Sequence, residues 1–176
     1  MKKFLILMLS IGILSCANNK TEQVSTIKIK DEKAQKISEM MKSYVSNNLD
    51  SNIISDDAKI KFNQLEMTKS DFENLVNTHH AMFSEISFPE GWMETVNYTG
   101  ADVKNAGGNY AEDYGSTWTS HWSDWTAVSK ISGDTISNPC FFGYKWENDK
   151  VVAINAIFPD EAFNKEVAMF MEANKK

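Results

Sequence analysis

The longest regular pattern of apolar and polar positions lies between Ser116 and Asp160. Runs of aromatic and β-branched residues in this block are interrupted by Ser132 to Asp134 and by Glu147 to Lys150, which contain turn-forming residues. This spacing predicts three long strands joined by two hairpins. Four of the five tryptophans fall within the block, and we expect them to be mainly structural residues of its sheet.

Three other segments have the spacing of apolar residues that is typical of an amphipathic helix. They run from Asp31 to about Asn48, from Thr68 to Glu85, and from Asp160 to Ala173. Ser70 to Glu73 has the spacing of a capping box, which predicts the start of the second helix. Asp160 is expected to cap the third helix.

The remaining segments predict shorter elements. Ile60 to Gln64 is expected to form a short strand, and Trp92 to Thr99 alternates as a half-buried strand does. Asp50 to Asp57 reads as a turn region. Gly100 to Gly115 has no periodicity, and loops of this length inside compact domains are often functional or mobile.

The N-terminal residues have the pattern of a bacterial secretion signal. A basic start and an apolar run from Phe4 to Leu14 are followed by Ile13-Leu14-Ser15-Cys16, which resembles a lipobox. We therefore expect residues 1–15 to be a signal peptide, Cys16 to carry lipid, and residues 16–30 to form a polar tether. Ala17 follows the cysteine and favours an outer-membrane location in the cell envelope. The alternative is an ordinary signal peptide with an incidental cysteine.

Charge and composition exclude several classes of function. The formal net charge is −6, and removal of residues 1–15 with their two lysines makes it −8. A chain this acidic is unsuited to nucleic acid, which needs clustered basic residues. The chain contains no arginine and no glycine-rich phosphate loop, so we expect no nucleotide cofactor. Cys140 is expected to be a buried strand residue rather than a catalytic thiol. The adjacent His79 and His80 point in different directions on a helix, so no metal site is expected.

The order of elements predicts an α+β domain over residues 31–176, in which helices lie on one face of an antiparallel sheet. The hairpin from Tyr144 to Val152 resembles that of SnoaL-like proteins in the nuclear transport factor 2-like superfamily. The preceding hairpin of these proteins is similar to Trp118 to Trp125 with the turn that follows. Their phenylalanine-aspartate ending is similar to Ile157 to Asp160. Asp149 replaces the usual turn glycine, and Pro159 is an insertion.

This resemblance implies a cone-shaped, curved antiparallel sheet wrapped around helices, with an apolar pocket at its wide end. It also implies a possible homodimer through the sheet. Some members of the superfamily are isomerases, cyclases or hydrolases that use a histidine or aspartate in the pocket. The candidates for such a role here are His121 and Asp124, although a spacing of three places them on opposite faces of a regular strand.

The residues expected to line a ligand pocket are His79, Tyr98, Trp122 and Asn155. His79 lies on the apolar stripe of the second helix, and Asn155 interrupts an apolar strand. Three functions remain open. The leading one is a membrane-anchored, non-catalytic module that binds a small apolar or amphipathic ligand. The others are an enzyme that uses His121, Asp124 or His79, and a glycan-binding surface formed by Tyr114 and tryptophans 118, 122 and 125.

Overall fold

A computed structural model describes residues 25–89, 91–108 and 112–175 of the chain. The signal peptide and the lipidated Cys16 that the sequence predicts lie outside these residues. The elements in chain order are β1 (Thr26–Ile29), α1 (Glu32–Val45), β2 (Ile54–Phe62), β3 (Leu65–Met67), α2 (Lys69–Met82), β4 (Phe83–Ser87), β5 (Gly91–Asn97), α3 (Ala101–Asn105), β6 (Thr117–Ser129), β7 (Thr135–Glu147), β8 (Lys150–Ile157) and α5 (Glu161–Ala173).

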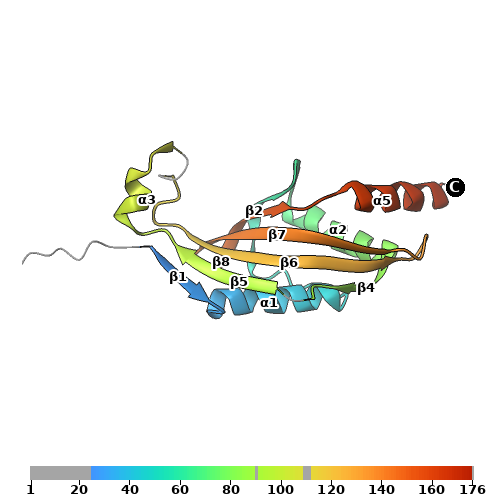
Figure 1. Ribbon diagram of the computed structural model, residues 1–176, viewed down its shortest axis with the longest axis horizontal. Helices are drawn as coiled ribbons and strands as arrows, with labels where there is room; N and C mark the ends of the chain where they lie inside the picture. The colour runs from blue at the N-terminus through green and yellow to red at the C-terminus, as the bar shows by residue number, and fades with distance from the viewer. Residues whose placement is uncertain (1–24, 90, 109–111, 176) are drawn as a thin grey trace, which may run out of the picture.

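The strands form one curved sheet in the order β1-β5-β6-β7-β8-β2-β3, and β4 pairs with β6 beyond the end of β5. Figure 1 shows the long strands β6 and β7 along the molecule, with α3 at one end and α5 at the other. The predicted α+β class and curved sheet are confirmed. The sheet is not wholly antiparallel, because β2 pairs with β8 in parallel after a long connection through the rest of the domain.

The helices α1 and α2 bury their apolar stripes against the inner face of the sheet. Ile37 of α1 is fully buried against Tyr144 and Trp146 of β7, while Val76 of α2 packs in a second cluster with Trp125 of β6. Burial of one such aliphatic side chain contributes about 1.5 to 3 kcal/mol. The inner face therefore holds the core, and alternate residues of β6 to β8 point outward.

A buried chain of hydrogen bonds holds the start of α1 against the sheet. Asp31 caps the helix by accepting from the Ala34 backbone N–H at 3.0 Å, and its Oδ1 also accepts from the Thr95 hydroxyl at 2.7 Å. The Thr95 and Thr119 hydroxyl oxygens lie 2.9 Å apart, and Trp146 Nε1 donates to Thr119 at 2.9 Å. These bonds connect α1 to β5, β6 and β7, and they orient the residues that α1 presents to the interior.

Several predicted boundaries differ from the structure. Residues 26–29 of the expected tether form β1, because they complete the edge of β5. The strand predicted to begin at Ile60 begins at Ile54, where it meets β8. The capping box of α2 uses Thr68 and Asp71 rather than Ser70 and Glu73.

The second helix ends at Met82, three residues earlier than predicted. Phe83 leaves the helix to pair with Ser129 of β6, and Glu85 has a positive φ of 52°. At the β7 to β8 turn, Asn148 and Asp149 both have positive φ, as this tight hairpin requires. Asp149 therefore takes a glycine-like conformation, and its carboxylate accepts from the Lys33 ammonium at 3.1 Å.

Candidate functional site

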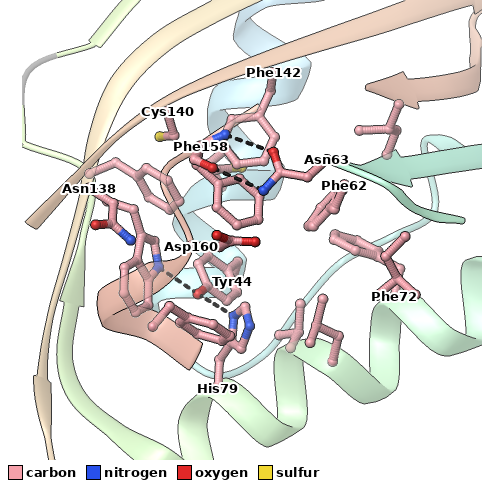
Figure 2. A pocket seen from close by; sticks show the side chains of 18 of the residues that line it. Tyr44, Phe62, Asn63, Phe72, His79, Asn138, Cys140, Phe142, Phe158 and Asp160 are labelled. Atoms are coloured by element: carbon pink, nitrogen blue, oxygen red, sulfur yellow. Dashed lines mark hydrogen bonds between the residues drawn. The ribbon is translucent and has the colours of Figure 1, made fainter. Parts of the chain in front are cut away.

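A cavity of about 370 Å³ lies between α1, α2, the inner face of the sheet and the start of α5 (Figure 2). We call it the central cavity. Its apolar lining residues are Met40, Met41, Leu49, Phe62, Leu65, Phe72, Leu75, Val76, Phe88, Phe142, Ile154, Phe158 and Phe163. Its other lining residues are Tyr44, Asn63, Gln64, His79, Trp125, Asn138, Cys140, Tyr144, Asp160 and Asn164. A mostly apolar cavity of this size, with a few polar groups, is typical of small-molecule sites.

Three aromatic residues form a relay of hydrogen bonds in the wall of this cavity. Trp125 Nε1 donates to the Tyr44 hydroxyl at 2.8 Å, and the Tyr44 oxygen lies 3.0 Å from His79 Nδ1 (Figure 2). Because the indole can only donate, the tyrosine oxygen accepts from it. His79 Nδ1 is the one acceptor among the described residues that the tyrosine proton can reach, so we assign Nδ1 as the acceptor and place the proton of a neutral imidazole on Nε2.

Burial keeps the groups of this relay neutral. The His79 ring is enclosed by Tyr44, Trp125 and Phe163, with ring centroids 5.2 to 6.1 Å away. Desolvation lowers the pKa of His79 to about 4, and the neighbouring His80 adds to this effect. Desolvation also raises the pKa of Tyr44 above its ordinary value. At neutral pH, His79 is therefore an uncharged residue with one N–H left to donate.

Cys140 lies in the same wall and is chemically unreactive. It is buried on β7, and its Sγ donates to the Ser123 carbonyl at 3.2 Å. Burial raises the pKa of the thiol to about 12, so the thiolate that a nucleophile needs is not formed at neutral pH. The prediction of a buried strand cysteine is confirmed.

The mouth of the cavity is formed by the β2–β3 turn and the segment that enters α5. Asn63 Nδ2 donates to the Phe158 carbonyl at 2.9 Å, and the Phe158 backbone N–H donates to Asn63 Oδ1 at 3.1 Å. Asp160 occupies the N-cap position of α5 but makes no capping hydrogen bond. Its exposed carboxylate is directed toward the cavity instead (Figure 2). The predicted capping role of Asp160 is therefore wrong.

No protein-family model matches the sequence, and no curated protein matches it. Solved structures do match. A proposed polyketide cyclase from Xanthomonas campestris pv. campestris has a TM-score of 0.56 and 8% identity, over 77% of this chain and 97% of that one. A nuclear transport factor 2-like protein from Burkholderia xenovorans LB400 has a TM-score of 0.53 and 13% identity, over 79% and 98%. The chain has the nuclear transport factor 2-like fold. The resemblance predicted from the sequence is confirmed at the level of the fold.

In this nuclear transport factor 2-like fold, the predicted site residues lie in different places. His79 lines the central cavity, whereas Tyr98 lies beyond the end of β5 and does not reach it. Trp122 and Asn155 are exposed on the outer face of the sheet, because they alternate with inward residues of β6 and β8.

The two catalytic candidates lie apart, as their spacing predicts. His121 is 2% exposed and points inward, whereas Asp124 is exposed on the opposite face of β6. His121 does not line the central cavity but a separate groove beside α1. The central cavity is also lined by four residues that no sequence pattern marks as site residues, namely Tyr44, Asn63, Asn138 and Asp160. Tyr44 fits the apolar stripe of α1, and local spacing carries no signal for its hydrogen-bond partners.

The outer face of the sheet carries a row of apolar side chains. Trp92, Trp122, Phe141 and Ile157 are successive cross-strand neighbours on β5 to β8, and the Trp122 and Phe141 ring centroids lie 4.4 Å apart. Exposed fractions of 52%, 55% and 65% for Trp92, Trp122 and Ile157 leave this row open to solvent. A homodimer through the sheet stays a prediction. Of the predicted glycan-binding tryptophans, Trp125 is buried in the core, which counts against that surface as proposed from sequence.

Within residues 25–89, 91–108 and 112–175, no helix has the length and apolar character needed to cross a membrane. The same residues contain no group of three or more histidine, cysteine or acidic side chains that could hold a metal ion.

Proposed function

We propose that the protein binds a small apolar molecule, bearing one hydrogen-bond acceptor such as a carbonyl group, in the central cavity without converting it. The size and apolar lining of the cavity support this proposal. The observation that carries it is the relay from Trp125 through Tyr44 to His79, which leaves the His79 Nε2–H as a neutral donor at the cavity wall.

The arrangement favours binding over acid and base catalysis. The lone pair of His79 Nδ1 accepts from Tyr44, so this imidazole has no free basic nitrogen. His121 and Asp124 do not line the cavity. Asp160 faces it from the exposed mouth, where water competes for its oxygens. An isomerase, cyclase or hydrolase would need a base whose pKa is tuned by the cavity, and binding needs none.

A matched pair of probes tests the donor role of His79. The bicyclic ketone 1-tetralone is expected to bind roughly twofold to tenfold more tightly than tetralin, which lacks the carbonyl, because one net hydrogen bond contributes about 0.5 to 1.5 kcal/mol. In a His79→Phe variant this preference is expected to disappear while tetralin still binds. Isothermal titration calorimetry measures both affinities.

Two further variants complete this test. Thr78→Ala changes an exposed residue of the same helix, which does not line the cavity, and should keep the preference for the ketone. Phe72→Trp adds bulk at the cavity wall and should weaken the binding of both probes. Equal affinities of the wild-type protein for ketone and hydrocarbon would contradict the donor role, and unchanged binding to Phe72→Trp would place the ligand elsewhere.

We also propose that the domain is anchored to a bacterial cell-envelope membrane, most simply the outer membrane, by lipid on Cys16. The lipobox-like segment before Cys16 supports this proposal. Full-length protein from bacterial cells is expected to partition into the detergent phase of Triton X-114, and a Cys16→Ala variant into the aqueous phase. Cys140→Ala is the matched control, because it removes the other cysteine and should leave partitioning unchanged. Aqueous partitioning of the wild-type protein would contradict lipidation.

A further inference from the structure

A second hollow, of about 620 Å³, runs between α1 and the segment that joins β4 to β5. We call it the α1 groove. One side is formed by successive turns of α1, from Ala34 through Met41 to Val45, and the other by Phe88 and Met93. Val45 is eleven positions after Ala34 on the helix, which is a length of about 16 Å. The groove is therefore long, largely apolar, and suited to an extended aliphatic chain.

His121 lies in this groove with neither ring nitrogen hydrogen-bonded to a described residue. His121 is only 2% exposed. Its Nδ1 is the one buried side-chain nitrogen or oxygen among the described residues that lacks a hydrogen-bond partner. A polar group left without a partner costs about 1 to 3 kcal/mol. The ring packs against Phe88 and Phe142, with centroids 5.8 and 6.0 Å away.

The second nitrogen of His121 is the one that a ligand can reach. Nε2 lies beside Gly91 on the groove wall, where a Cβ atom on residue 91 would come within 2.8 Å of it. In proteins, a buried N–H group without a partner is rarer than a buried acceptor without one. Because Nδ1 is buried without a partner, we assign the proton to Nε2 rather than to Nδ1. His121 therefore presents an N–H donor to the groove.

The charges around the groove favour an anion. Among the described residues, the charged ones that line it are Lys30 and Lys42, and none of these described lining residues is acidic. This is unusual in a chain whose net charge is −6. We propose that the α1 groove binds an aliphatic monocarboxylate, whose carboxylate accepts from His121 Nε2–H in the field of the two lysines and whose chain lies along α1.

The α1 groove and the central cavity are separate sites. Met41 and Phe88 line both and form the partition between them, whereas Met93 lines the groove alone and Met40 lines the cavity alone. The two sites also differ in charge, because the groove has lysines at its rim and the cavity has Asp160 at its mouth. The groove ligand does not depend on the function proposed for the cavity.

Methionine methyl groups can tell the two sites apart. The experiment titrates sodium octanoate into full-length mature protein carrying ¹³C-methyl methionine, and follows the methyl signals by NMR. The Met93 signal is expected to shift while that of Met40 stays in place. 1-Octanol, which has the same chain without the charge, is expected to bind about tenfold more weakly, since hydrogen bonds to charged groups are stronger than neutral ones.

Variants of the groove test the contribution of each group. Lys30→Gln combined with Lys42→Gln is expected to weaken octanoate binding roughly threefold to tenfold. Lys36→Gln removes a lysine of the same helix that pairs with Glu32 outside the groove, and should leave the affinity unchanged. Gly91→Ala places a methyl group against Nε2 and is expected to abolish the preference for octanoate over octanol.

Other outcomes overturn the proposal. A shift of Met40 without Met93 would place the carboxylate in the central cavity. Absence of any shift up to the solubility limit of octanoate, or equal affinity for octanoate and octanol, would remove the groove as an anion site. The tetralone titration reports on the central cavity and the octanoate titration on the α1 groove. A negative result with octanoate therefore does not affect the function proposed for the cavity.

Discussion

The free energy of unfolding is expected to fall as the pH drops from about 6.5 to about 4, because two histidines in apolar surroundings, the half-buried His79 and the buried His121, stay neutral in the folded protein. Desolvation lowers the pKa of both His79 and His121 to about 4, from an ordinary value of 6.5. Between these values the unfolded chain binds protons that the folded protein does not. Stability is therefore complete above pH 6.5, is lost as the pH falls, and levels off below about 4.

The expected size of this loss is large for a domain of this length. A lowering of the pKa from 6.5 to about 4 corresponds to about 3 kcal/mol for each histidine as an upper figure. Urea unfolding at several pH values between about 7.5 and about 4.5 measures the loss of the free energy of unfolding. This window avoids the carboxylates of Asp56, Asp71 and Asp149, whose lowered pKa values place their own contribution at more acid pH.

A His121→Phe variant isolates one of the two contributions. Phenylalanine fills the space between Phe88 and Phe142 and does not titrate, so the variant should lose about half of the acid dependence. Its stability at pH 7 should match or exceed that of the wild-type protein, because His121 makes no hydrogen bond to a described residue and the change removes a buried nitrogen that lacks a partner. An acid dependence identical to that of the wild-type protein would contradict the assignment to His121.

A Tyr44→Phe variant is expected to lower the free energy of unfolding by about 2 to 4 kcal/mol at pH 7. The change removes only the hydroxyl group, but it leaves both Trp125 Nε1–H and His79 Nδ1 without a partner in an apolar environment. Each unsatisfied group costs about 1 to 3 kcal/mol. Urea unfolding followed by circular dichroism measures the difference.

Tyr98→Phe is the matched control for this variant. Tyr98 is half-buried, and its hydroxyl makes no hydrogen bond to a described residue, so its removal should change stability by no more than about 0.5 kcal/mol. If Tyr44→Phe were as stable as the wild-type protein, the relay from Trp125 to His79 would not be formed, and the donor role proposed for His79 would lose its basis.

Most of the fold can be predicted from the sequence because its signals are local. Alternation of apolar and polar residues from Thr117 to Ile157 reflects the two faces of a strand, so it predicts three strands and their hairpins without knowledge of their partners. The same holds for the stripes of α1, α2 and α5. The errors arise where a distant strand decides the outcome. Residues 26–29 become β1 because β5 has an open edge, and α2 ends early because Phe83 pairs with β6.

The candidate site could be predicted only in part. The apolar stripe of α2 includes His79, and this position predicts one imidazole near the interior. Tyr44 and Trp125 also belong to apolar patterns, so their sequence positions predict burial but not the hydrogen bond between them. That bond joins residues 81 positions apart and depends on how α1 crosses the sheet. The sequence position of Asp160 predicts a helix cap, and only the path of the chain directs its carboxylate to the cavity.

The motif from Tyr144 to Val152 resembles the nuclear transport factor 2-like superfamily in sequence. The sequence by itself also determined the order of α1, α2, α5 and five of the strands (β2 and β5 to β8), and that His121 and Asp124 lie on opposite faces of β6. These features depend on periodicity within single elements. The tertiary structure alone decided which polar groups meet in the central cavity and that His121 faces a separate groove beside α1. Those features depend on contacts between residues far apart in the chain, which the packing of α1 and α2 against the curved sheet brings together.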